Sequence, residues 1–182
     1  MLNNYPFLSD MPNPISTLLC LKNLIMMALL TILVSALMTT PVVAGDFEDG
    51  LRYSFDKNYN NAATSFRNSA ESGDANAQFN LALMYEEGRG VMRDYKQAAT
   101  WYLNAAEQGQ ALAQLRLAKM LIDGKGIKHD YVEAYKWFSL AKEKNIRGAK
   151  ISLDRVESLL TKTQISEAQL RKSQWLKSHQ II

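Results

Sequence analysis

Two stretches of this chain repeat each other, YEEGRGVMRDYKQAATWY at residues 85–102 and LIDGKGIKHDYVEAYKWF at residues 121–138. Both contain a Gly-x-Gly turn, an Asp-Tyr pair and an aromatic doublet, and matched positions differ by 36 residues. The matched residues are Gly88, Gly90, Asp94, Tyr95, Ala98 and Trp101 in the first copy, and Gly124, Gly126, Asp130, Tyr131, Ala134 and Trp137 in the second. Self-similarity at a period of about 20–50 residues indicates an architecture of stacked repeats.

Each copy is predicted to be a pair of helices. In residues 75–87, apolar and small side chains recur at the spacings of one helical face, and Gly88 follows where a left-handed residue would end the helix. Asp94 can accept hydrogen bonds from the first-turn amides of a second helix, and Gln97 completes something like a capping box. Asp130 repeats this arrangement 36 residues later.

Stacking is needed because one helix pair cannot enclose a core, whereas three or more stacked pairs bury a continuous one. The sequence therefore predicts an all-α fold, an α/α solenoid of antiparallel helix pairs. Its parts are a degenerate first repeat at 45–74, full repeats at 75–110 and 111–146, and a C-terminal helical cap at 147–182. Within the cap, Thr161 and Gln164 predict another helix start.

The pattern from Ala75 to Gly109 resembles the Sel-one-like repeat, a relative of the tetratricopeptide repeat, because a dozen positions agree in two consecutive copies. The resemblance covers residues 75–146 well and residues 46–74 loosely, where the turn is shorter. It implies a right-handed superhelix of helix pairs that serves as an adaptor or scaffold. Family members are common as exported bacterial proteins, some tied to envelope assembly, host interaction or signalling.

The resemblance also implies where a partner would bind. The inner surface of a tetratricopeptide superhelix is lined by first-helix positions one, four, eight and eleven residues after the leading alanine. Here these are Asn76, Phe79, Leu83 and Glu86 in one repeat, and Leu112, Leu115, Lys119 and Ile122 in the next. Five of the eight are large and apolar, which favours a groove for a helix or extended peptide with apolar anchors. The alternatives are that curvature or the C-terminal helix covers them, or that they pack in a homodimer.

The N-terminal region differs from the rest of the chain. No charged residue lies between Lys22 and Asp46, and residues 24–38 form an apolar run that suits a secretory signal better than a membrane span. Residues 1–44 are therefore predicted to be a signal peptide cleaved after Ala44, or alternatively an N-terminal membrane anchor at residues 23–45. Either reading places the folded part outside the cytoplasm, in the periplasm or secreted.

Composition narrows the function classes. With 47% hydrophobic and 21% charged residues the chain is that of a folded protein, and its net charge of +3 predicts no nucleic-acid partner. Nine basic and four acidic residues follow Ala141, scattered as on a solvated helical surface. Cys20, the single cysteine, lies in the segment expected to be removed, so the mature part would hold no disulfide. A cysteine-rich branch of the resembled family is linked to penicillin binding or β-lactamase-like activity, and this chain departs from it.

Candidates for catalysis are scarce. His129 precedes Asp130 in a helix–helix turn with no second ligand at metal spacing, and His179 is expected in a frayed tail. The Gly-x-Gly turn is not followed by the Lys-Ser/Thr pair that a phosphate-binding loop contains. Trp101 and Trp137 have the spacing of core residues rather than of a stacking site for a sugar or base.

The sequence therefore predicts a non-enzymatic adaptor without cofactor or metal, which binds a protein or peptide partner through its concave face in a bacterial envelope or secreted context. Membrane contact is expected only if the N-terminal segment stays uncleaved. Two rival hypotheses remain: a cell-wall-associated hydrolase or hydrolase inhibitor, and a self-assembling structural element.

Overall fold

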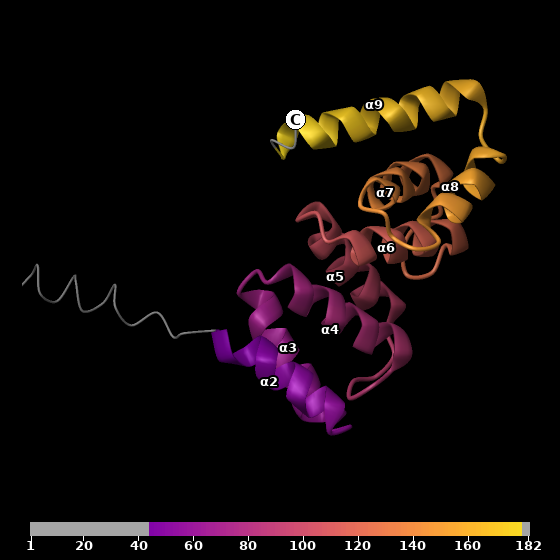
Figure 1. The fold of residues 1–182 in the computed structure, drawn as a ribbon. Coiled ribbons are helices and arrows are strands. Elements are labelled where there is room, and N and C mark those ends of the chain that lie inside the picture. Colours follow the sequence, from indigo (N-terminus) through magenta and orange to yellow (C-terminus); the bar gives the residue numbers. More distant parts are fainter. Residues whose placement is uncertain (1–43, 180–182) are drawn as a thin grey trace, which may run out of the picture. The chain divides into compact units, whose positions relative to one another are not determined.

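The computed structural model describes residues 44–179, and α-helices account for most of them (Figure 1). The helices are α2 (Ala44–Phe55), α3 (Tyr59–Glu71), α4 (Ala75–Glu87), α5 (Tyr95–Glu107), α6 (Ala111–Asp123), α7 (Tyr131–Glu143), α8 (Ala149–Glu157) and α9 (Lys162–Ser178). No strand occurs within these residues. The all-α prediction is confirmed.

Each helix from α2 to α7 packs on the helix that follows it, and Figure 1 shows successive helices running back and forth beside one another. The pairs α4–α5 and α6–α7 coincide with the two full copies of the repeat. This arrangement is the predicted α/α solenoid of helix pairs.

The second helix of each repeat begins at the predicted aspartate. The Asp94 carboxylate accepts hydrogen bonds from the backbone amides of Lys96 at 2.9 Å and Gln97 at 3.1 Å. The Asp130 carboxylate accepts one from the amide of Glu133 at 2.9 Å. These bonds satisfy first-turn donors that have no partner within the helix.

The reciprocal half of the capping box does not form in these repeats. It would need the side chain three residues later to accept from the aspartate's own amide. That amide donates instead to the end of the preceding helix, from Asp94 to the Tyr85 carbonyl at 3.0 Å and from Asp130 to the Leu121 carbonyl at 3.1 Å. The two helices of a repeat are thereby tied together at the turn.

The two glycines of each turn have different tasks. The first, Gly88 or Gly124, ends the preceding helix with a positive φ of 72° or 65°, which glycine adopts without a Cβ penalty. The second lies against the previous helix pair. A Cβ on Gly90 would be 2.1 Å from the Tyr59 carbonyl oxygen, and one on Gly126 would be 2.0 Å from that of Tyr95. The second glycine therefore allows neighbouring repeats to approach at the backbone.

The core consists of small residues at helix crossings and aromatic residues between them. Six alanines at the helix crossings are fully buried: Ala82, Ala98, Ala105, Ala118, Ala134 and Ala141. The largest fully buried side chains include Trp137, Tyr102, Phe66 and Phe138. One apolar cluster lies around α3 and α4 and a larger one extends to α9, with Tyr85 and Trp101 packed against both. Core packing of Trp101 and Trp137 is as predicted.

Two buried glutamines repeat at the same interval. Gln78 donates from Nε2 to the Ala70 carbonyl at 3.1 Å, and Gln114 donates to the Ala106 carbonyl at 3.2 Å. Each bond joins the first helix of one repeat to the last turn of the helix before it. The glutamine thus adds a second donor to a carbonyl that also accepts from a turn amide, that of Gly73 for Ala70 and that of Gly109 for Ala106.

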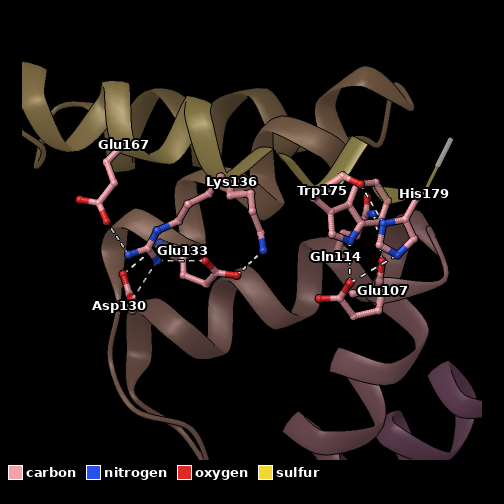
Figure 2. Close-up of polar contacts among 10 residues, drawn as sticks. Glu107, Gln114, Asp130, Glu133, Lys136, Glu167, Trp175 and His179 are labelled. Atoms are coloured by element: carbon pink, nitrogen blue, oxygen red, sulfur yellow. Dashed lines mark hydrogen bonds and ion pairs between the residues drawn. The ribbon is translucent and has the colours of Figure 1, made fainter. Parts of the chain in front are cut away.

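The C-terminal helix α9 packs on α7 and begins at Thr161 with a complete capping box involving Gln164, as predicted. Two clusters of polar contacts hold α9 in place (Figure 2). In the first, Arg171 contacts Glu133 at 3.2 Å and Asp130 at 3.7 Å. Its hydrogen bond to Glu167 on the same helix raises the pKa of Arg171, which keeps the guanidinium charged.

The second cluster of contacts that holds α9 is centred on Trp175. Its Nε1 donates to Glu107 of α5 at 2.6 Å, and its ring meets that of Trp137 with centroids 5.9 Å apart. His179 stacks on Trp175 at 4.2 Å and lies 3.7 Å from Glu107 (Figure 2). The expectation of a frayed tail at His179 is therefore corrected, because aromatic stacking and a carboxylate hold this residue in place.

The predicted N-terminal signal or anchor lies outside the described residues, apart from Ala44 and, for the anchor, Gly45, with which α2 begins. Among the helices of residues 44–179, none combines the length and the apolar character that a bilayer span requires.

Candidate binding surface

The eight residues expected to line a groove lie on α4 and α6, the first helices of the two full repeats. Asn76, Leu112 and Lys119 are exposed. Phe79, Leu83, Glu86 and Ile122 are partly buried, and Leu115 is only 8% exposed and belongs to the core. We call the surface that carries these residues of α4 and α6, together with the equivalent residues of α8, the first-helix face.

The C-terminal helix does not pack on this face. The main helix partner of α9 is α7, and its polar contacts reach α5 and α7. Leu112 remains 43% exposed, and Ile151, the equivalent on α8 of Phe79 and Leu115, is 77% exposed. Apolar side chains are thus accessible at this face.

The groove between α4 and α6, here the first groove, is bridged by the chain's own polar side chains. The Tyr102 hydroxyl donates to Glu86 at 2.6 Å, and Arg116 of α6 lies 3.6 Å from the same carboxylate. Burial of the phenol, reinforced by Glu86, raises the pKa of Tyr102 well above its ordinary range. Glu86, predicted to face a partner, is therefore engaged within the chain.

The groove between α6 and α8, here the second groove, has lost this network. The positions 36 residues after Glu86, Tyr102 and Arg116 hold Ile122, Phe138 and Ser152. None of these three replacements can form an ion pair, and the serine is far smaller than the arginine it replaces. A cavity of about 310 Å³ opens there, lined by residues that include Lys119, Ile122, Tyr131, Phe138, Ser152, Arg155 and Leu159.

The rim of the second groove carries unpaired positive charge. Lys119 of α6 and Arg155 of α8 occupy equivalent positions 36 residues apart, and neither forms an ion pair with any described residue. Asp123, the one acid among the described residues that line the cavity, lies 3.3 Å from Lys125. The groove therefore offers an apolar floor beneath two available cations.

A further cavity of about 290 Å³ lies beside α9, lined by residues that include Gln108, Gln114 and Trp175. The buried Oε1 of Gln114 has no hydrogen-bond partner among residues 44–179, whereas Oε1 of its equivalent Gln78 accepts from Gln108 at 2.7 Å. Lys144 occupies the position equivalent to Gln108. This cavity separates the cap from the α5–α6 turn and shares no lining residue with the second groove.

The residues considered for catalysis or metal binding either lie exposed at the surface or cap helices. His129 is exposed and meets the edge of the Tyr131 ring at 4.1 Å. Asp94 and Asp130 cap helices. Within residues 44–179, no group of three His, Cys, Asp or Glu side chains is placed to hold a metal ion.

A family model of the Sel1 repeat matches residues 75–110 and 111–146. The chain carries two Sel1 repeats. They coincide with the pairs α4–α5 and α6–α7, so the resemblance to the Sel-one-like repeat is confirmed.

Solved structures with Sel1-like folds are similar to this chain. A protective antigen present in uropathogenic Escherichia coli strains, displaying an SLR fold, is 31% identical with a TM-score of 0.70, over 75% of this chain and 30% of that one. A Sel1 repeat protein from Oxalobacter formigenes is 31% identical with a TM-score of 0.60, over 65% of this chain and 52% of that one. This chain thus spans about a third to a half of those proteins. A comparison with curated proteins finds no match.

The sequence prediction missed the contribution of α8 to the second groove. Counting 36 residues onward from Leu115 and Lys119 reaches Ile151 and Arg155 on α8, so the repeat period contained the signal. The segment after Gly148 lacks the Gly-x-Gly turn and the Asp-Tyr pair, and these absences favour a cap rather than a further repeat. In the structure this cap also supplies one wall of the groove.

Proposed function

We propose that this protein is an adaptor that binds a protein or peptide partner on its first-helix face, the concave face of the expected superhelix. The observation that carries the proposal is the contrast between the two grooves. The first groove is bridged by contacts among Glu86, Tyr102 and Arg116, whereas a cavity opens in the second groove between α6 and α8. Clefts with an apolar lining and a few polar groups are the usual binding sites of proteins.

The exposed apolar residues of this face support the proposal. Leu112 lies on α6, one residue after position 111, and Ile151 lies on α8, four residues after the equivalent position 147. Anchors spaced along a row of helices suit an extended or helical peptide that crosses the row. Stacked helix pairs form extended binding surfaces of this kind.

The proposal is tested by selecting random peptides displayed on phage against the purified protein and measuring the binders on variants. Leu83→Glu and Leu112→Glu place a charge on the first-helix face, and we expect each to weaken binding at least about tenfold, because an apolar contact becomes a desolvated carboxylate. Met92→Glu is the matched control, since Met92 is 88% exposed in the α4–α5 turn. Circular dichroism confirms that each variant folds. Recovery of no binders, or loss of binding in the control alone, would refute the proposal.

We further propose that the protein is exported. The apolar run at residues 24–38, the preceding Lys22 and the small residue at Ala44 support this. Intact mass of protein recovered from the cell envelope distinguishes a chain cleaved after Ala44 from one that keeps residues 1–44 as an anchor. Recovery of all the protein from the cytoplasm would contradict export.

A further inference from the structure

We propose that the second groove takes a partner segment in which an apolar side chain stands next to a carboxylate. The inference rests on the proposed function and adds the chemistry of the partner. The apolar side chain would enter the cavity between α6 and α8, and the carboxylate would pair with Lys119 and Arg155.

The first groove shows how this repeat accommodates a carboxylate. Glu86 projects between α4 and α6, where it accepts from Tyr102 and lies beside Arg116. At the equivalent place in the second groove, Ile122 supplies no carboxylate, yet positive charge remains close by at Lys119 and Arg155. A carboxylate from a partner would restore the charge balance that the first groove achieves within one chain.

The apolar part of the partner is inferred from the floor of the cavity. Ile122 and Phe138 stand where the first groove has Glu86 and Tyr102, and Leu159 adds another apolar side chain. Ser152 leaves free the volume that Arg116 occupies in the first groove. An aliphatic or aromatic side chain removes this apolar surface from water. A segment with carboxylates alone would leave it exposed.

The local charges favour an acidic partner over a basic one. Within residues 44–179, Asp123 is the only acid that lines the cavity, and Lys125 pairs with it. Asp154 and Glu157 of α8 do not line the cavity. The two cations therefore face the groove without a competing carboxylate, and charge-assisted hydrogen bonds to a carboxylate are the strong ones.

The test uses synthetic peptides on a fixed Gly/Ser background whose central pair combines Leu, Phe or Ala with Glu, Gln or Lys. Binding to the full chain is measured by fluorescence anisotropy at low salt. We expect the Leu-Glu and Phe-Glu peptides to bind at least about tenfold more tightly than their Gln counterparts, and the Ala-Glu peptide to bind more weakly than either. Equal binding of the Glu and Gln peptides, tighter binding of the Lys peptides, or no binding to the second groove would overturn the inference.

Variants assign the effect to the groove. Replacing both cations, Lys119→Gln with Arg155→Gln, should abolish the preference for Glu over Gln. Ile122→Glu should do the same by supplying an internal carboxylate, whereas Ile122→Gln should not. Lys128→Gln with Lys150→Gln removes two exposed cations that do not line the cavity and should leave the preference intact.

The two proposals fail in different ways. If phage selection yields peptides that bind the first-helix face without an apolar–acidic pair, the adaptor function stands and the inference about the second groove falls. If selection yields no peptide for this face, the adaptor function itself falls.

Discussion

Single residues set the distance between repeats, and the second glycine of each turn is the clearest example. Gly90 and Gly126 have φ values of 67° and 70° and lie against the backbone of the preceding repeat. Gly109 also has a positive φ, 82°, but apart from its chain neighbours no atom of the described part of the chain lies within 4 Å of a Cβ built on it. Comparing Gly109 with Gly90 and Gly126 therefore distinguishes the cost of a positive φ from the cost of a Cβ that overlaps the neighbouring backbone.

We expect Gly90→Ala and Gly126→Ala to lower the free energy of unfolding more than Gly109→Ala. All three substitutions force alanine into the left-handed region, at about 1–2 kcal/mol. The first two add an overlap with a carbonyl oxygen, which costs about 1–3 kcal/mol more, as overpacking does. Urea unfolding followed by circular dichroism measures the difference. Equal losses in the three variants would show that the backbone contact is unimportant.

Tyr102 predicts a dependence of stability on alkaline pH. Because burial and the bond to Glu86 raise its pKa above the ordinary value of 10.0, the folded chain keeps the phenol protonated at pH values where the unfolded chain ionises it. Its contribution to stability is complete below that ordinary value and is lost as the pH rises beyond it, at up to about 1.4 kcal/mol per pH unit.

We expect Tyr102→Phe to be less stable than the parent by about 1 kcal/mol at neutral pH, because the hydrogen bond to Glu86 is lost. Above the ordinary tyrosine pKa the difference should shrink, since phenylalanine does not ionise. Urea unfolding at a series of alkaline pH values measures both curves, and parallel curves would contradict the argument.

Among the helices, α9 is attached to the repeats by a few strong contacts. Arg171 pairs with the start of α7, Lys172 pairs with Glu143 at its end, and Trp175 contacts both α5 and α7. The rest of α9 includes exposed side chains such as Leu170. Its docking therefore combines these contacts with an apolar face, in which Ile165, Ala168 and Leu176 pack with Trp175 on the larger core cluster.

We expect Trp175→Ala to release α9, because truncating a buried tryptophan costs about 3–5 kcal/mol. Hydrogen exchange should then become faster in residues 162–178 while α4 and α5 stay protected. Leu170→Ala is the matched control on the same helix, at a side chain 57% exposed. Similar exchange of α9 in the two variants would show that Trp175 does not hold the helix.

Across the molecule from α2 to α9, stability is distributed along the stack. The cluster around α3 and α4 contains few large buried side chains, chiefly Phe66, Leu81 and Met84, whereas the larger cluster includes Tyr102, Trp137 and Phe138. Repeat proteins unfold partly unit by unit, because each repeat contacts only its neighbours.

We expect Phe66→Ala to unfold α2 and α3 locally and leave α6 and α7 folded. Phe66 packs against Gly50 and Phe47 of α2, so its removal takes away a large apolar contact between α2 and α3. Hydrogen exchange read by mass spectrometry resolves the helices. Uniform loss of protection from α2 to α9 would instead mean that the stack unfolds as one unit.

The period, the helix pairs, the helix-ending glycines and the capping aspartates could all be predicted from the residues, because these features depend on local spacing and backbone conformation. Which face stays open could not. Leu115 and Glu86 occupy predicted groove positions, yet one is buried and the other is bound to Tyr102, because neighbours from other helices set the surroundings of each side chain. The open second groove likewise exists only where α6, α7 and α8 meet, and it is the packing of these helices that brings Lys119 and Arg155 to its rim.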